Sequence, residues 1–340
     1  MTDEASRVAG GRIVRITQID GKLPNLALMR LSAWHRANGD DVRWERGTTR
    51  RLGEPDYDLV YGSAIFSTSE KAVALFRTQF PDAIVGGDGG DKCLRVEGIV
   101  PNQFTALDYS GYPDFLGSIG YAMRGCRFKC GFCVVPKREG AARSNSPIGQ
   151  IWRGDPHPRH IHLLDNDFFG NPDWRLIVSE IETGRFKVCI NQGINVRLID
   201  DEQAEAVVRI APWDDQFNRR RLYTAWDNIG DERVFFDGID RLENAGWKAE
   251  WTFTYMLIGY DPRETWDRII HRFERMVERG IRPYPMVFGG NDRRARPPEY
   301  DRLKRFQRWV ITGAHKVSPF SEYSTKRKRD GLPDFWADVA

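Results

Sequence analysis

The strongest constraint on the fold is a regular alternation of short apolar runs with amphipathic stretches in the second half of the chain. Six runs are rich in β-branched and aromatic residues: SIGYAMR, HIHLLD, KVCINQG, RLYTAWD, TFTYMLIG and YPMVFG. Between them apolar residues recur at helical spacing, as in Trp266, Ile269 and Phe273. Strands separated by helices favour a parallel sheet, so an α/β fold with an open, partial (β/α)6 barrel is predicted. Its chemistry is expected where the strands end.

The first part of the chain predicts a smaller parallel α/β domain of the Rossmann-like kind. Strand-like runs at 12–19, 57–66 and 83–90 alternate with helical patterns at 26–39 and 71–81. The second helix is expected to carry Ala72, Leu75 and Phe76 on its apolar face, and His35 in the first is expected to be a structural, partly buried residue. We predict three parts: this domain with a linker over 1–115, the barrel over 116–290, and a basic helical extension over 291–340.

Composition restricts the kind of protein. A chain of 340 residues that is 41% hydrophobic can bury a large core. No apolar run approaches the roughly 18 residues that cross a bilayer, and the first residues lack the long apolar segment of a secretory signal. Five cysteines, an odd number, do not fit a disulfide framework. A cytoplasmic protein without membrane partners is therefore expected.

Three of the five cysteines lie within eight positions, at Cys126, Cys130 and Cys133. One short loop with this spacing can bring three thiolates to one metal centre. A structural zinc site would need a fourth ligand. Cys93 and Cys189 are isolated, the first as a loop thiol and the second inside a strand pattern. A [4Fe-4S] cluster held by three cysteines would leave one iron open to a small molecule.

The run Cys126-Arg-Phe-Lys-Cys130-Gly-Phe-Cys133, just after the first strand of the six, resembles the signature of the radical S-adenosylmethionine (SAM) enzymes. Phe132, directly before the last cysteine, matches the aromatic residue that packs on adenine in that family. The resemblance implies a [4Fe-4S] cluster whose open iron binds the methionine part of SAM. It further implies reductive cleavage of SAM to a 5′-deoxyadenosyl radical, which removes hydrogen from a substrate, and an external electron donor such as flavodoxin or ferredoxin.

The resemblance covers about residues 118–290 and extends to the ends of four later strands. The segment DND would bind the methionine amino group, although the usual Gly-Gly-Glu is absent and a plain strand-ending turn is an equal alternative. The next strand ends would face the cofactor or substrate, the ribose, and the adenine. The matching residues in chain order are Asp165, Asp167, Asn191, Gln192, Arg197, Asp227, Asn228, Ile258 and Gly259.

The first domain resembles the cobalamin-binding-type domain that precedes many radical SAM cores. Cobalamin proteins of this shape often bind cobalt through a histidine in a D-x-H-x-x-G loop after the first strand. The corresponding loop here, QIDGKLPNLALM, has no histidine, so cobalamin is not expected. The glycine-rich segment 86–90 lacks the G-x-G-x-x-G spacing of a nucleotide site and is expected to be a turn.

The substrate is the least constrained part of the prediction. Residues 291–340 hold twelve Lys and Arg against seven Asp and Glu, with basic runs at 293–298 and 326–329. This excess slightly favours a nucleotide or nucleic acid as the substrate, although such runs are more often solvated surface. Two alternatives remain at this point: a cobalamin-dependent radical SAM methyltransferase, and a non-enzymatic nucleic-acid-binding protein that a metal stabilises.

Overall fold

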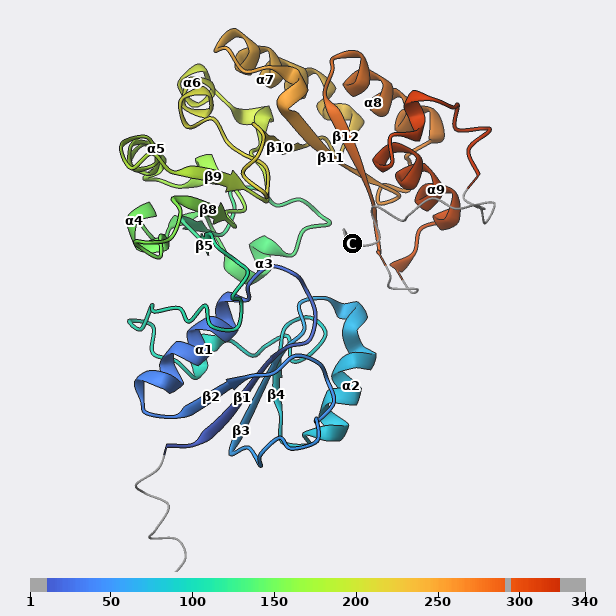
Figure 1. Cartoon of the computed structure of the whole chain (residues 1–340). Coiled ribbons are helices and arrows are strands. Elements are labelled where there is room, and N and C mark those ends of the chain that lie inside the picture. Colours follow the sequence, from blue (N-terminus) through green and yellow to red (C-terminus); the bar gives the residue numbers. More distant parts are fainter. Residues whose placement is uncertain (1–10, 291–294, 325–340) are drawn as a thin grey trace, which may run out of the picture. The chain divides into compact units, whose positions relative to one another are not determined.

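The computed structural model describes residues 11–290 and 295–324, which fall into two compact units (Figure 1). Unit 1 comprises the chain up to Ala122 together with Ser146–Leu164 and Thr183–Phe186, and unit 2 comprises Met123–Asn145, Asp165–Glu182 and the chain from Lys187 onward. The domain boundaries expected from the sequence stay predictions. The basic run 293–298 lies partly outside the described residues, and the run 326–329 lies wholly outside them.

Unit 1 is built on a parallel four-stranded sheet in the order β2-β1-β3-β4. Its strands are β1 (Ile13–Gln18), β2 (Asp41–Trp44), β3 (Leu59–Ser63) and β4 (Ile84–Gly86). Helices α1 (Leu26–Ala37) and α2 (Glu70–Gln79) lie on opposite sides of this sheet (Figure 1). The expected parallel α/β arrangement of the first part of the chain is confirmed.

The two faces of this sheet each bury their own apolar cluster. Leu28 and Leu31 of α1 pack with Val14 and Ile16 of β1 on one face, and Phe76 of α2 packs with Val85 on the other. The prediction that Leu75 lies on the apolar face of α2 is wrong, because this side chain is 45% exposed. The helix turns Val73 toward the sheet instead, at i−3 from Phe76.

Polar residues in unit 1 serve structural purposes. The Asp20 carboxylate, in the loop after β1, accepts hydrogen bonds from the backbone N–H groups of Ile65 and Phe66 at 2.6 and 2.9 Å. His35 is 2% exposed and shares hydrogen bonds with Asp40 and Tyr61. His35 is therefore the buried structural histidine that the sequence predicts.

A second pair of parallel strands completes the sheet structure of unit 1. β5 (Ser118–Gly120) pairs with β8 (His160–Leu163), and the short helix α4 (Ile148–Ile151) precedes β8 in the chain. The single strand expected over 118–124 is wrong in its extent. It is interrupted after Gly120, and its last part, β6 (Met123–Arg124), pairs antiparallel with β7 (Arg143–Ser144) in unit 2.

Unit 2 continues the alternation of strands and helices. After the β6–β7 hairpin its elements are, in chain order, α5 (Trp174–Thr183), β9 (Lys187–Ile190), α6 (Asp201–Ile210), β10 (Leu222–Ala225), α7 (Glu232–Asn244), β11 (Thr252–Ile258), α8 (Trp266–Glu278), β12 (Arg282–Val287) and α9 (Tyr300–Ile311); α3 (Val135–Glu139) lies inside the hairpin. β10, β11 and β12 form a parallel sheet. The Asp200 and Gln203 side chains form a capping box at the start of α6.

The β10–β12 sheet has two different faces. Burial alternates along each strand, and the buried face packs on helices: Trp226 stacks on Phe235 of α7 with ring centroids 5.2 Å apart. The other face is only partly covered, and we call it the open face. Its residues are Tyr223, Ala225, Phe253, Tyr255, Leu257, Arg282, Tyr284 and Met286.

The last described α-helix, α9, lies in the extension that was expected to be helical, and it buries Leu303, Phe306 and Val310. Among the residues that the structure describes, no helix combines the length and the apolar character needed to cross a membrane.

Candidate functional site

The three clustered cysteines lie on a loop between β6 and α3, which we call the cysteine loop (Cys126–Cys133). Gly125 precedes it with φ of +80°, and a Cβ atom there would lie 2.1 Å from the carbonyl oxygen of Ala141. Only glycine fits this close approach of two backbones. The β6–β7 hairpin therefore fixes the point at which the cysteine loop begins.

The three thiols are half-buried and unbridged. Burial raises the pKa of the Cys126 thiol, and the charges of Asp167, Cys133 and Cys130 raise it further. The thiols therefore act on one another electrostatically. Within residues 11–290 and 295–324, however, no three His, Cys, Asp or Glu side chains converge closely enough to hold a metal ion. The donor set suits an iron–sulfur centre, while ligation would require the cysteine loop to draw together.

No residue from Cys126 to Val134 is buried, so the cysteine loop depends on side-chain contacts for its position. Asp167, which is 2% exposed, provides the strongest of them. Its carboxylate accepts from Nε and Nη2 of Arg127 at 2.8 and 2.9 Å and from the Arg127 backbone N–H at 3.1 Å. A two-point ion pair of this kind fixes orientation as well as distance.

The rest of the DND segment also contacts the hairpin that carries the cysteine loop. Asp165 is fully buried and accepts from the backbone N–H of Met123 at 3.2 Å. Asn166 donates to Glu139, whose same oxygen accepts from Arg124 Nε and the Gly125 N–H, both at 3.0 Å. The segment Asp165–Asp167 therefore holds the cysteine loop in place. Neither interpretation of the sequence included this role.

We expect Asp167→Asn to loosen the cysteine loop without unfolding unit 2. Loss of the charged pair removes roughly 1.4 kcal/mol of the free energy that keeps the loop closed, which corresponds to about tenfold more opening. Because the Asp167 charge also raises the pKa of Cys126, rates are compared per thiolate, with the thiolate fraction taken from the pH dependence of alkylation. Alkylation of the Cys126 thiolate by iodoacetamide in the metal-free protein, followed by peptide mass spectrometry, should be about tenfold faster. Asp261→Asn is the matched control, since its partner Arg263 is exposed. An unchanged Cys126 rate in Asp167→Asn would contradict the assigned role.

Two charged residues that follow strands act on Cys130 electrostatically. Arg197 follows β9 and Asp227 follows β10. Burial raises the pKa of Cys130; the Arg197 cation opposes this rise, and the charges of Cys133 and Asp227 add to it. Arg197 also lies over the ring of Phe128 in the cysteine loop, 5.5 Å from its centroid. Both residues were expected at the site from the sequence; Arg197 contacts Phe128 of the cysteine loop, and the charge of Asp227 acts on Cys130.

Asp227 is held by the neighbouring strand. Its Oδ1 accepts from the backbone N–H of Leu257 in β11 at 2.9 Å, and burial raises its pKa. Oδ1 therefore holds the end of the strand, and Oδ2 remains a hydrogen-bond acceptor.

An aromatic contact joins the cysteine loop to the end of β11. The rings of Phe132 and Tyr260 are 5.4 Å apart at an interplanar angle of 75°, and Tyr260 also contacts Phe288 at 4.8 Å. A Cβ on Gly131 would lie 2.6 Å from the Tyr260 hydroxyl. Tyr260 is a site residue that the sequence analysis missed, although it directly follows the expected Ile258 and Gly259.

The other expected residues are less directly placed at the cysteine loop. Ile258 is fully buried on the helix-packed face, and Gly259 has φ of +79° and donates to Glu264. The Asn228 side chain caps the turn that follows it by accepting from Gly230 N–H. Asn191 accepts a hydrogen bond from Tyr255 through its carbonyl oxygen, and Gln192 is exposed. Ile258 and Gly259 can thus offer only backbone to a ligand.

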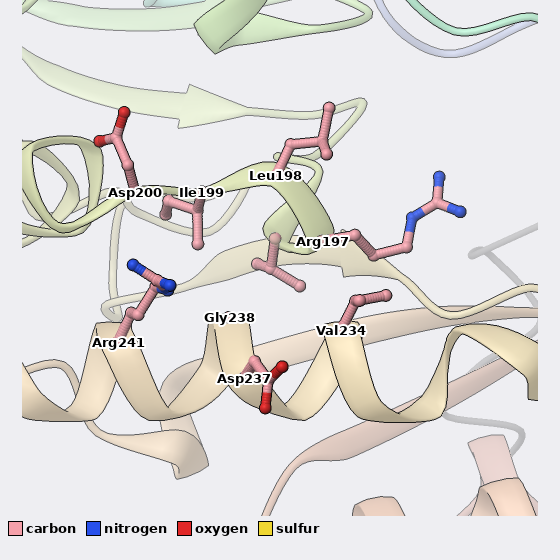
Figure 2. A pocket seen from close by; sticks show the side chains of 9 residues that line it. Arg197, Leu198, Ile199, Asp200, Val234, Asp237, Gly238 and Arg241 are labelled. Atoms are coloured by element: carbon pink, nitrogen blue, oxygen red, sulfur yellow. The ribbon is translucent and has the colours of Figure 1, made fainter.

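A small hollow lies near this site, between the segment Val196–Asp200 and α7 (Figure 2). A Cβ on Gly238 of α7 would lie 2.0 Å from the Val196 carbonyl oxygen, so the two backbones touch there. Figure 2 shows the Arg197 guanidinium extending away from Arg241, at the far end of the hollow. No cysteine lines the hollow. Of the expected site residues, only Arg197 is among those that line it, so the hollow is distinct from the cysteine loop.

Comparison of the chain with models of protein families, with curated proteins and with solved structures finds no match.

Proposed function

We propose that this protein is a radical SAM enzyme whose unit 2 contributes to a partial (β/α)6 barrel. Cys126, Cys130 and Cys133 would hold a [4Fe-4S] cluster. The observation that most supports this proposal is that the cysteine loop contacts Arg197 and Tyr260, which follow β9 and β11, while the charge of Asp227, which follows β10, acts on Cys130. In α/β folds the edge at which the strands end is where ligand sites form.

The residues around the cysteine loop suit the recognition of SAM. When bound, the cluster supplies the electron that cleaves SAM to methionine and a 5′-deoxyadenosyl radical. Phe132, with Tyr260 against its edge, offers a ring face to adenine. Arg197 offers a cation for a carboxylate, and Asp227 an acceptor for hydroxyl or amino groups.

Asp165 and Asp167 take a different part in this proposal from the one that the resemblance implied. Asp165 accepts a backbone hydrogen bond, and Asp167 is paired with Arg127. We therefore assign them to positioning the cysteine loop rather than to binding the methionine amino group. An external donor such as ferredoxin or flavodoxin would deliver the electron, the protein would act in the cytoplasm, and we do not propose cobalamin as a cofactor.

Anaerobic reconstitution of the full chain with iron and sulfide tests this proposal. We expect a brown protein with about four irons per chain. After chemical reduction it should convert SAM to 5′-deoxyadenosine and methionine, which chromatography measures. A colourless protein that retains one zinc ion and leaves SAM intact would contradict the proposal and would favour a metal that serves structure alone.

A further inference from the structure

The open face of the β10–β12 sheet has the chemistry of a ligand site beyond the cysteine loop. Strand register aligns its residues in rows: Tyr223 is opposite Phe253, which is opposite Arg282. One row nearer the carboxyl ends, Tyr255 is opposite Tyr284. The face therefore presents four aromatic rings over three neighbouring strands.

The rings form one continuous surface. Tyr223 and Tyr255 are stacked with centroids 6.0 Å apart and an interplanar angle of 13°, and Phe253 and Tyr284 are 5.1 Å apart. Each of the four is partly exposed, unlike the residues of the helix-packed face. Because the Tyr255 ring is turned by 87° from Tyr284 and by 76° from Phe253, a flat aromatic ligand can stack on Tyr223 and Tyr255 and meets the other two rings edge to face.

Two arginines flank this surface at the amino ends of the strands. The guanidinium carbons of Arg221 and Arg282 lie 5.9 and 5.7 Å from the Phe253 ring centroid. Across the described residues neither guanidinium has an ion-pair partner. Asp214, the acid whose charge reaches Arg221, has its own carboxylate engaged by the backbone N–H groups of Asn218 and Arg219.

The Arg221 and Arg282 guanidinium groups lie close to the same Phe253 ring and repel each other electrostatically. A bound anion would reduce this repulsion. Burial lowers the pKa of Arg221, and the Arg282 charge lowers it further. Guanidinium groups bind phosphate by paired hydrogen bonds, and they tolerate partial burial better than ammonium groups do.

The length of the open face restricts the ligand. From the row of Tyr223 to Asp227 the strand advances four residues, or about 13 Å at the rise of a parallel strand. Arg221 and Arg282 lie at one end of this distance, and Asp227 and Cys130 lie at the other. A single sugar or amino acid is too short to reach both ends, whereas a nucleoside diphosphate is of the right size.

We propose that the open face binds a nucleotide, with its phosphates between Arg221 and Arg282 and its base stacked on Tyr223 and Tyr255, the two rings that are nearly parallel. The remainder of the ligand lies toward Asp227 and the cysteine loop. The assignment of this nucleotide as the substrate rests on the proposed function. The binding itself needs neither the cluster nor SAM.

Calorimetric titration of the full chain, purified without a cluster, tests the site with ADP and adenosine as probes. We expect Arg221→Gln and Arg282→Gln each to weaken ADP binding at least about tenfold, the effect of one lost charge-assisted contact. Adenosine binding should change little in either variant, whereas Tyr255→Leu should weaken both probes. Arg233→Gln is the matched control, because Arg233 is an exposed arginine of α7 in an i,i+4 pair with Asp237.

Arg282 is exposed, so its variant is expected to fold even where Arg221→Gln does not. The proposal would be overturned if both arginine variants bind ADP with unchanged affinity. It would also be overturned if Arg233→Gln loses as much affinity, or if the native chain does not bind ADP at millimolar concentration. If ADP binding depends on the arginines but the reconstituted protein does not cleave SAM, the nucleotide site stands and the proposed reaction is refuted. SAM cleavage without ADP binding would do the reverse.

Discussion

Replacing Cys130 by alanine is expected to abolish both iron retention and SAM cleavage in reconstituted protein. The cysteine loop supplies three thiols, and two thiolates cannot hold a [4Fe-4S] cluster that needs three protein ligands. We expect iron to fall from about four per chain to near zero, and 5′-deoxyadenosine to fall to the level of a protein-free reaction. Iron analysis, the visible absorption spectrum and chromatography measure these losses.

The chain provides two matched controls for this experiment. Cys93 is exposed in a loop of unit 1, and Cys189 is fully buried in β9. Cys93→Ala should leave iron content and SAM cleavage unchanged. Cys189→Ala removes a small core side chain and should lower stability by about 1 kcal/mol while keeping the cluster. Iron retained in Cys130→Ala, or lost equally in Cys93→Ala, would refute the assigned ligands.

Arg272→Ala is expected to destabilise unit 2 by about 3–5 kcal/mol, the usual cost of breaking a buried ion pair on one side. The Arg272 side chain is fully buried and paired with Glu264. It donates to the carbonyl oxygens of Trp226 at 2.7 Å and Leu257 at 2.9 Å. Truncation leaves the Glu264 carboxylate without its cation and the two carbonyl oxygens without their Arg272 donor. Urea unfolding followed by tryptophan fluorescence measures the change.

A second arginine on the same helix is the control for this prediction. Arg275 pairs with Glu232 and Glu278 at the surface of α8, and such exposed pairs contribute less than about 1 kcal/mol. Arg275→Ala should therefore shift the urea midpoint only slightly. If the Arg272 and Arg275 variants unfold at the same urea concentration, the buried Arg272–Glu264 pair does not contribute the expected free energy of unfolding. Adding Glu264→Gln to the Arg272 variant should recover part of the loss, because it removes the unpaired carboxylate.

Arg272 also connects the stability of unit 2 to the geometry of the site. Its two carbonyl partners belong to Trp226 and Leu257, the residue before Asp227 and the residue whose N–H binds Asp227. The helix α8 therefore holds the ends of β10 and β11 in register at the place where Asp227 lies beside Cys130. A variant that weakens this contact is expected to affect the site as well as the fold.

Strands and helices with strong apolar periodicity were predictable from the sequence. Runs such as TFTYMLIG place apolar residues densely enough that a buried strand is the dominant choice, and β11 follows it closely. β2 was not predicted, because the run DVRW has one buried residue and three that are not. Its place at the edge of the sheet comes from pairing with β1, which lies far away in sequence.

The sequence singles out the cysteine loop because its three cysteines are close together in the chain, whereas the contacts that hold the loop were not predictable. Arg127 and Asp167 are forty residues apart. Glu139 gathers groups from Arg124, Gly125 and Asn166 without any periodic pattern. The free arginines of the open face were equally hidden, since their relation to Phe253 depends on strand register. Such contacts depend on tertiary structure, and they cannot be predicted from a single sequence.

The position of the cysteine loop outside both cores has a consequence for how the protein matures. No residue from Cys126 to Val134 is buried, and the sheets of both units pack through side chains elsewhere in the chain. Folding is therefore not driven by metal, in contrast to zinc fingers, which unfold when the ion is removed. If the cysteine loop holds a [4Fe-4S] cluster as proposed, a chain that loses its iron to oxygen should stay folded, so that repair needs new iron and sulfide but no refolding.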